Sequence, residues 1–326
     1  MQTCLITGGA GFIGSHVADR LLARGDRVVS LDNIDPFYAR EIKERNLSSA
    51  AGNPSFRFVE GDIRDESLVA RLFEEEKPDS VFHSAARAGV RPSIADPLGY
   101  EDVNVRGTLV LLEAARKAGV RHFVFASSSS VYGENPKVPF SEDDFVDHPI
   151  SPYAATKKAG ELIAYTVHHL SGMPVTCLRF FTVYGPRQRP DLAIHKFTRL
   201  IDEGQPIPVF GDGSTSRDYT YIDDIVDGVV RAIDRPDGYK IINLGESTTV
   251  TLSEMIAEIE RALGKKAAID RQPLQPGDVP RTYADVEKAR RLLGYEPRTP
   301  FREGIDRFVA WYRETVAAPT AAGGKR

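Results

Sequence analysis

The stretch TCLITGGAGFIGSHVADRLLARG, residues 3–25, decides the fold. A short apolar run leads into a turn with three glycines, and an amphipathic helical pattern follows over 13–23. Gly8, Gly11 and Gly14 have G-x-x-G-x-x-G spacing. Glycines at such a turn let the backbone approach a pyrophosphate closely, and the pyrophosphate then lies at the N-terminus of the helix. The stretch therefore predicts a strand–turn–helix unit that binds a dinucleotide.

The alternation of strand and helix continues through the first half of the chain. Continuous apolar runs, which are typical of strands buried on both faces, lie at 3–8, 27–32, 57–62, 80–86, 122–128 and 175–181. Helical patterns separate them, such as the one over 100–118 that Gly119 closes. This pattern predicts a doubly wound α/β fold, a parallel sheet covered by helices on both faces.

The pattern loosens after residue 181, where segments rich in Pro and Gly indicate loops that can wrap a ligand. Further strand-like runs and helical patterns lie at 217–222, 240–245, 251–263, 284–293 and 301–315. We predict a Rossmann domain at 1–181 with returning elements near 217–249, a smaller C-terminal α/β lobe at 182–216 and 250–316, and a disordered tail at 317–326.

Composition excludes several classes of partner. The chain has 42 Lys and Arg against 46 Asp and Glu, a net charge of −4 that predicts no nucleic-acid surface. Met1 leads directly into a strand-like run, and no apolar stretch approaches the roughly 20 residues that a membrane span needs. Cys4 and Cys177 lie in apolar runs, as buried thiols of a reducing compartment do. The seven histidines lack metal-ligand spacing. We expect a cytoplasmic protein with no metal site and no membrane contact.

Two acidic residues at predicted strand ends select the cofactor. Asp32 follows Gly14 by eighteen residues, where a carboxylate can accept both hydroxyls of a ribose and repel a 2′-phosphate. NAD is therefore expected rather than NADP. Asp62, after the third strand, can accept the adenine amino group. A role in a surface turn is the alternative for both residues.

Tyr153 and Lys157 have i, i+4 spacing within a helical pattern, so their side chains share one face. An ammonium beside a phenol favours the phenolate and lowers the phenol pKa from about 10. A phenolate can remove a hydroxyl proton while hydride leaves the same carbon for a nicotinamide. Such a pair alone is common on helix surfaces. Beside a predicted NAD site and a strand that ends in serines, it predicts a catalytic pair.

Five motifs together resemble the extended short-chain dehydrogenase/reductase family of nucleotide-sugar epimerases and dehydratases. They are TGGAGFIG, SSSSVYG, YAATK, RFFTVYGPRQRPD and GDGSTSRDYTYIDD, in order over roughly residues 2–315. The resemblance implies a Rossmann domain with tightly bound NAD, a lobe that binds a nucleoside diphosphate sugar, and a triad of Ser128, Tyr153 and Lys157. It also implies a homodimer that pairs the helices at 100–118 and 151–170 in a four-helix bundle.

The family mechanism assigns roles to these residues. Tyr153 would take the proton of the sugar 4-hydroxyl while NAD takes the hydride from C4, and the 4-keto sugar would turn over and receive the hydride on its other face. NAD is regenerated, and Lys157 would also bind the nicotinamide ribose. An apolar strand end is an equally good account of Ala85. The cofactor contacts expected in this way are Gly8, Gly11, Phe12, Ile13, Gly14, Asp32, Asn33, Asp62, Ile63, His83, Ala85, Asn104 and Lys157.

Ser129 and Ser130 distinguish among the reactions of this family. Dehydratases that share the scaffold carry an Asp-Glu pair directly after the triad hydroxyl, and decarboxylases carry a Glu two residues before the Tyr of VYG. Here serines occupy these positions. Dehydration and decarboxylation need an acid–base group at these positions, and serine does not supply one. The reaction that remains is oxidation at C4 with return of the hydride.

Thr182 favours UDP-glucuronate as the substrate. In RFFTVYGPRQRPD it resembles the UDP-glucuronate 4-epimerases, whereas hexose 4-epimerases typically have Asn there. Ser128, Ser129, Ser130 and Thr182 would then converge on the C6 carboxylate. A 4-keto uronate is a β-keto acid, and several hydroxyls can hold its carboxylate away from the alignment that releases CO₂. Hydroxyls also fit the 6-hydroxyl of glucose, so UDP-glucose/UDP-galactose 4-epimerase stays open. The segment AGVRPS, which contains Arg91, also resembles the uronate enzymes, and a loop charge is the alternative for Arg91.

Arginines are the expected ligands of the nucleotide diphosphate. Arg217 resembles the family's diphosphate-binding arginine, and Arg189 is a second candidate with a solvated loop charge as its alternative. Many relatives have Arg where this chain has Gln275, which weakens the assignment of a further phosphate arginine there. Asp278 is a candidate ribose contact.

Two other classes of function remain as alternatives. A net NAD-dependent nucleotide-sugar dehydrogenase or reductase would release NADH or NAD in each turnover. A non-catalytic NAD sensor would not need the triad, and the intact Ser128, Tyr153 and Lys157 argue against it.

Overall fold

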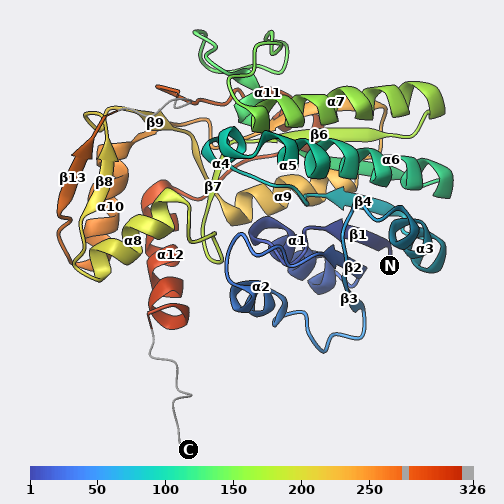
Figure 1. Cartoon of the computed structure of the whole chain (residues 1–326), viewed down its shortest axis with the longest axis horizontal. Coiled ribbons are helices and arrows are strands. Elements are labelled where there is room, and N and C mark those ends of the chain that lie inside the picture. Colours follow the sequence, from blue (N-terminus) through green and yellow to red (C-terminus); the bar gives the residue numbers. More distant parts are fainter. Residues whose placement is uncertain (274–278, 318–326) are drawn as a thin grey trace, which may run out of the picture.

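The computed structural model describes residues 1–273 and 279–317. Seven parallel strands form the central sheet in the order β11-β6-β5-β4-β1-β2-β3 (Figure 1). Their bounds are β1 Thr3–Thr7, β2 Arg27–Asp32, β3 Phe56–Glu60, β4 Ser80–His83, β5 His122–Ser128, β6 Val175–Phe180 and β11 Tyr239–Leu244. The six strands predicted in the first half are confirmed, and the run at 240–245 adds the seventh.

Helices cover both faces of the sheet. On one face lie α1 (Phe12–Ala23), α9 (Ile222–Ile233) and α11 (Glu287–Leu293), and on the other α3 (Glu66–Glu76), α6 (Gly107–Ala118) and α7 (Pro152–Ser171) (Figure 1). Side chains of β5 alternate between two separate cores, Phe123 and Phe125 in one and Val124 and Ala126 in the other. Because both faces are buried, the strands read as continuous apolar runs.

Two predicted helices differ from the structure. The segment 284–293 was expected in the lobe, but α11 packs against α9 and β11, and Tyr295 Oη donates to Gly245 O at 3.0 Å. The helix expected over 100–118 begins as α5 (Pro97–Glu101), passes through a π-helical turn at Asp102–Arg106 and continues as α6. Gly119, at φ +69°, ends it as predicted.

The remaining elements form the smaller lobe and the connections. Strand β8 (Ile207–Phe210) pairs with β13 (Ile269–Gln272), beside helices α8 (Ala193–Asp202), α10 (Leu252–Leu263) and α12 (Phe301–Thr315), at the left of Figure 1. Short pairs connect this lobe to the sheet: β7 (Thr182–Tyr184) with β10 (Tyr219–Tyr221), and β9 (Ser216–Arg217) with β12 (Val250–Thr251). The other helices are α2 (Arg40–Leu47), α4 (Val90–Ala95) and the 3-10 turn η2 (Ser129–Tyr132).

The strand order reverses between β1 and β4, so the chain leaves these two strands in opposite directions and a crevice opens at their carboxyl ends. Cys4 and Cys177 are buried free thiols, as predicted. Within 1–273 and 279–317, none of the helices is long and apolar enough to cross a bilayer. Of the tail predicted at 317–326, residues 318–326 lie outside the described residues.

Candidate active site

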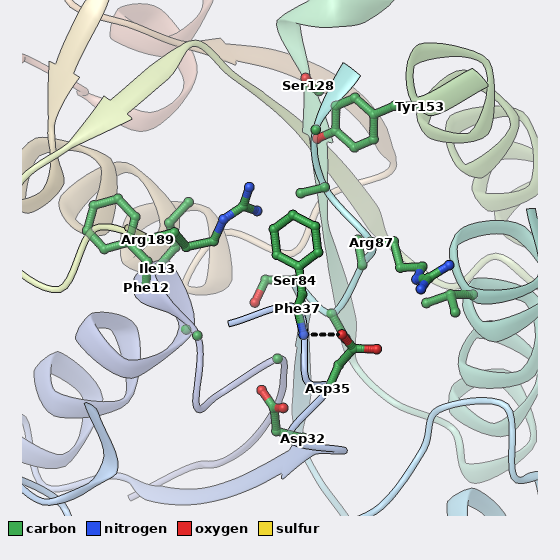
Figure 2. A pocket seen from close by; sticks show the side chains of 18 of the residues that line it. Phe12, Ile13, Asp32, Asp35, Phe37, Ser84, Arg87, Ser128, Tyr153 and Arg189 are labelled. Atoms are coloured by element: carbon green, nitrogen blue, oxygen red, sulfur yellow. Dashed lines mark hydrogen bonds between the residues drawn. The ribbon is translucent and has the colours of Figure 1, made fainter. Parts of the chain in front are cut away.

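A cavity of about 450 Å³ lies at the carboxyl edge of the sheet. Its wall is formed by the glycine turn after β1, the end of β2, the end of β5, the start of α7 and the segment after β6 (Figure 2). This is the crevice that the strand order predicts for ligands of open α/β sheets. The cavity brings together most of the residues that the sequence singled out.

The glycine turn leaves no space for side chains. Gly8 has φ +71°, and a Cβ there would lie 2.7 Å from Ala85 N, while a Cβ on Gly14 would lie 2.3 Å from Gly8 O. Helix α1 begins after Gly11 without a side-chain cap, so its first amide groups have no side-chain acceptor. Uncapped amides at a helix N-terminus favour an anion. The turn therefore fits a pyrophosphate, and Phe12 and Ile13 line the same cavity.

Asp32 lies at the end of β2 on the wall of the cavity. Its carboxylate accepts Ala10 N at 3.1 Å and Ile34 N at 2.9 Å, and Lys43 Nζ lies 3.5 Å from Oδ1. These contacts hold one rotamer of an acceptor group at the place where the sequence predicts a ribose. The site thus fits the adenosine ribose of NAD.

Asp62 lines the neighbouring part of the cavity, together with Asn33 and Ile63. Arg64 contacts its Oδ2 at 2.6 Å, and Asn33 Nδ2 donates to the same oxygen at 3.1 Å. The Arg64 hydrogen bond is the main cause that lowers the pKa of Asp62 to about 2. Asp62 is therefore an ionised acceptor, as contact with an adenine amino group requires.

His83 and Asn104 do not reach the cavity, contrary to the expectation that they contact the cofactor. His83 is buried, with Nδ1 2.7 Å from Thr7 Oγ1 and Nε2 2.8 Å from Thr108 Oγ1. Burial lowers the pKa of this imidazole to about 3, so it is neutral. Asn104 lies in the π-helical turn, accepts Arg87 N at 2.8 Å and donates to Arg87 O at 3.0 Å. Both residues support the wall from behind.

Ser128, Tyr153 and Lys157 meet where β5 and α7 pack together. The Ser128 hydroxyl is hydrogen-bonded to the Tyr153 phenol, and the two side chains lie beside each other in Figure 2. Lys157 Nζ donates to Ala126 O at 2.7 Å. Ser151 caps α7 by accepting Ala154 N at 3.2 Å, which starts the helix at the correct turn for Tyr153. The three residues of the predicted triad therefore line one cavity.

The pKa of Tyr153 differs from the expectation. Burial is the largest influence and raises this pKa, while the Ser128 hydrogen bond and the charge of Arg189 lower it. Lys157 was expected to supply the lowering charge, but its ammonium is directed at the carbonyl of Ala126. Burial also lowers the pKa of Lys157, to about 8.

Ser129 and Ser130 turn away from the cavity wall, whereas they were expected to converge on the substrate. They begin the turn η2, for which Ser128 is the cap: Ser130 N donates to Ser128 Oγ at 3.1 Å, and Ser128 Oγ donates to Ser130 Oγ at 3.0 Å. Both are partly exposed, and only Ser127 and Ser128 of the four serines line the cavity. Ser130 therefore acts on Ser128 rather than directly on a ligand in this arrangement.

Thr182 and Arg189, from the segment after β6, also line the cavity. Arg189 contacts Asp191 through Nε at 3.0 Å and Nη2 at 2.7 Å. Its guanidinium lies over the ring of Phe37 at 5.2 Å, as Figure 2 shows. A cation and a hydroxyl thus face the cavity from one short segment.

Arg217 and Arg91 lie outside the lining of this cavity. Arg217 is in β9 opposite Val250, and Arg91 lies over the ring of Phe210 at 4.6 Å. The predicted diphosphate role of Arg217 is thus not met by this cavity. Gln275 and Asp278 lie outside the described residues. In the described part of the chain, no group of acidic, His and Cys residues can hold a metal ion.

Sequence reasoning missed several residues of the wall, all on loops or on a distant helix. Lys43 lies on α2 beside Asp32, and Phe37 and Tyr38 belong to the loop between β2 and α2. These two aromatic residues lie in a polar segment shortly after Asp32, and this pattern could have predicted that the segment lines the cavity. Lys43 had no such signal, because most residues of its helix are charged and only the fold turns this residue inward.

Comparison with known proteins places the chain in a family. The family model described as GDP-mannose 4,6-dehydratase matches residues 5–308. The chain belongs to this family. This member of the family has Ser129 and Ser130 at the positions where an Asp-Glu pair is expected in a dehydratase. The resemblance to extended short-chain dehydrogenases and the doubly wound fold are confirmed.

Relatives of this family member have narrower names. The chain is 44% identical to the UDP-glucuronate 4-epimerase of Thermodesulfobacterium geofontis, over 96% of each chain. It is 44% identical to UDP-glucuronate 4-epimerase 2 of Arabidopsis thaliana, over 94% of this chain and 75% of that protein. A crystal structure of UDP-glucuronic acid 4-epimerase from Bacillus cereus with UDP-glucuronic acid and NAD has a TM-score of 0.91 at 36% identity, over 96% of this chain and 99% of that one.

Proposed function

We propose that the protein is an NAD-dependent UDP-sugar 4-epimerase that interconverts UDP-glucuronate and UDP-galacturonate. The observation that carries this proposal is the hydrogen-bonded Ser128 and Tyr153 above a dinucleotide cradle, followed by serines at the two positions where dehydratases carry acids. The names of the relatives support the same substrate.

The chain has the groups that NAD requires. The side-chain-free glycine turn fits the pyrophosphate, Asp32 the adenosine ribose and Asp62 the adenine amino group. When bound, NAD supplies the acceptor and donor of the hydride at sugar C4. Lys157 lines the cavity beside Tyr153 and is the group of this chain that would hold the nicotinamide ribose.

Tyr153 moves the proton. Its phenol oxygen takes the proton of the sugar 4-hydroxyl when C4 is oxidised and returns it when C4 is reduced. The contact with Ser128 and the charge of Arg189 both lower the pKa of this phenol, which favours the phenolate. The groups at the triad that can transfer a proton are a phenol and a hydroxyl. Elimination of water from the sugar would need a carboxylic acid there, and the triad has none.

The uronate is favoured over glucose by the segment opposite the triad. Thr182 and Arg189 line the cavity there, and a guanidinium suits a carboxylate better than a neutral 6-hydroxyl. Ser128 and Thr182 also suit a hydroxyl. A crystal structure of UDP-glucose 4-epimerase from Thermotoga maritima with UDP-glucose has a TM-score of 0.89 at 36% identity, so UDP-glucose is the competing substrate.

Product analysis tests this function. Purified protein is incubated with UDP-glucuronate or UDP-glucose without added NAD, and the nucleotide sugars are separated by chromatography. We expect UDP-galacturonate from UDP-glucuronate and no accumulation of NADH absorbance. Conversion of UDP-glucose alone would transfer the proposal to the hexose enzyme. Stoichiometric NADH would replace it with a net dehydrogenase.

The proposal extends to assembly. Helices α6 and α7 pack side by side, and their outer surface exposes Leu109, Leu162 and Tyr165. An apolar surface on two helices packed side by side suits pairing with a second copy in a four-helix bundle. Light scattering of the wild type and of Leu162→Glu tests this homodimer: we expect a dimer that the charge disrupts, and a monomeric wild type would contradict it.

A further inference from the structure

Helix α7 is joined to the end of β5 by three side chains, each one turn after the last. Tyr153 bonds Ser128, and Lys157 donates to Ala126 O at 2.7 Å. The third is Glu161, which accepts Ser127 Oγ at 2.7 Å. The triad uses the first two contacts, whereas the third has no role in the chemistry described above.

Glu161 is also half of a buried ion pair. Arg179 of β6 contacts Glu161 through Nε–Oε1 at 2.8 Å and Nη2–Oε2 at 2.8 Å, and both side chains are 1% exposed. The Arg179 guanidinium lies over the ring of Tyr132 at 4.9 Å. Desolvation of two charges costs about as much as their attraction returns, so such a pair is weak evidence for a role in stability.

The ion pair lies where a displacement of α7 along β5 would also displace the triad residues. Ser127 and Arg179 are register partners between β5 and β6. Successive side chains of a strand point to opposite faces, so the contact that holds Ser127 also sets the direction of Ser128. The bidentate contact allows Glu161 one orientation, and α7 carries Tyr153 two turns before it.

We propose that Glu161 and Arg179 are positioning residues, which fix the register between α7 and β5 and so hold Tyr153 against Ser128. The inference rests on the proposed function for its kinetic consequence. It assigns no chemistry to either residue, since neither lines the cavity. Its structural consequence, the hydrogen bond between Ser128 and Tyr153, is measurable without substrate.

Removing Glu161 alone would leave the Arg179 charge buried and unpaired, which destabilises strongly, and removing Arg179 alone would leave Glu161 only Lys158, whose Nζ lies 3.9 Å from Oε2. The test variant is therefore the double substitution Glu161→Leu with Arg179→Met, because an apolar pair of similar volume is often neutral for stability. Ser127→Ala removes only the hydroxyl link and keeps the ion pair. The matched control is Thr176→Val, which removes a buried hydroxyl contact to His122 at 3.0 Å from the start of the same two strands.

We expect the double variant to unfold near the wild-type temperature and to retain NAD and the wild-type KM. Its kcat should fall by about 10- to 100-fold, the size of loss that follows a displacement of roughly 1 Å. Ser127→Ala should lower kcat by about 3- to 10-fold, and Thr176→Val should leave it unchanged. A folded double variant with wild-type kcat would overturn the inference.

A second measurement does not depend on turnover. In protein with ¹³C-labelled tyrosine, the Cζ resonance of Tyr153 is assigned by its loss in Tyr153→Phe and followed with pH. The Ser128 hydrogen bond lowers the pKa of Tyr153, so the resonance should titrate at higher pH in the double variant and at the wild-type pH in Thr176→Val. Equal titration in all three proteins would overturn the inference, even if the wild type proved not to be an epimerase.

Discussion

The wall formed by β5 and α7 consists of two long elements packed against each other, whereas the facing segment, residues 182–192, combines the short strand β7 with a turn. On the first wall, Lys157 contacts the carbonyl of Ala126 in the neighbouring strand. In the second, Arg189 pairs with Asp191 two residues along, and Gln188 Nε2 donates to Val183 O at 3.1 Å. Tyr153 is therefore held by rigid elements, whereas Arg189 belongs to a loop that can differ among relatives.

The largest expected effect is on the β5–α7 wall. Tyr153→Phe removes the group that moves the proton, and general acid–base catalysis typically contributes about 10²- to 10⁴-fold. We expect kcat for UDP-glucuronate to fall by about 10³-fold, with KM and thermal stability near wild type. Initial rates of UDP-galacturonate formation measure this. A variant within tenfold of the wild-type rate would show that another residue moves the proton.

Lys157→Met tests the cost of the buried ammonium on the same wall. Burial lowers the pKa of Lys157 from 10.5 to about 8 in the folded protein. Between these pH values the unfolded chain binds the proton and the folded one does not, so the free energy of unfolding rises with pH. At pH 7 the NAD-free variant should therefore be more stable than wild type, by on the order of 2 kcal/mol.

Urea unfolding of both proteins at pH 7 and pH 10 measures this difference. The gain from Lys157→Met should shrink at the higher pH, because wild-type Lys157 is then neutral in the folded state. If the free energy of unfolding of both proteins changed equally between pH 7 and pH 10, the result would contradict the lowered pKa of Lys157 and the desolvation of this wall.

A smaller effect is expected on the facing segment. Thr182→Val keeps the shape of the side chain and removes its hydroxyl, so the KM for UDP-glucuronate should rise about 5- to 10-fold while kcat changes little. The control is Thr198→Val, which removes a buried hydroxyl that has no hydrogen-bond partner. An equal loss for both variants, or a fall in kcat alone, would remove Thr182 from substrate recognition.

The smallest effect is expected at Phe37, whose ring lies under the Arg189 guanidinium. The ring is 45% exposed, and a cation–π contact at an exposed site contributes about 0.5–1 kcal/mol. Phe37→Ala should therefore raise the KM about 2- to 5-fold and leave the unfolding temperature unchanged. Initial rates of UDP-galacturonate formation over a range of UDP-glucuronate concentrations measure it. A fall in kcat as large as that of Tyr153→Phe would show that the loop also positions the reacting groups.

Much of the cofactor side could be predicted, because its signals are local in the chain. The glycine spacing of residues 8–14 is a property of one turn, and Asp32 follows from the end of the next strand. Tyr153 and Lys157 are one helical turn apart, so their common face follows from helix geometry. The alternation of apolar runs and helices predicted the sheet for the same reason.

The sequence by itself thus determined the fold class and the cofactor, and it placed Tyr153 and Lys157 on one helix face. Only the tertiary structure decided that Lys43 meets Asp32, that His83 is buried behind the wall, and that Arg179 pairs with Glu161. The His83 contact joins β4 to β1, which are neighbours in the sheet but not in the chain, and the other two contacts depend on how a helix docks on the strand next to it in the chain. Which side chains meet there depends on strand order, on the face of each strand and on helix docking, and none of these is encoded in the spacing of a single motif.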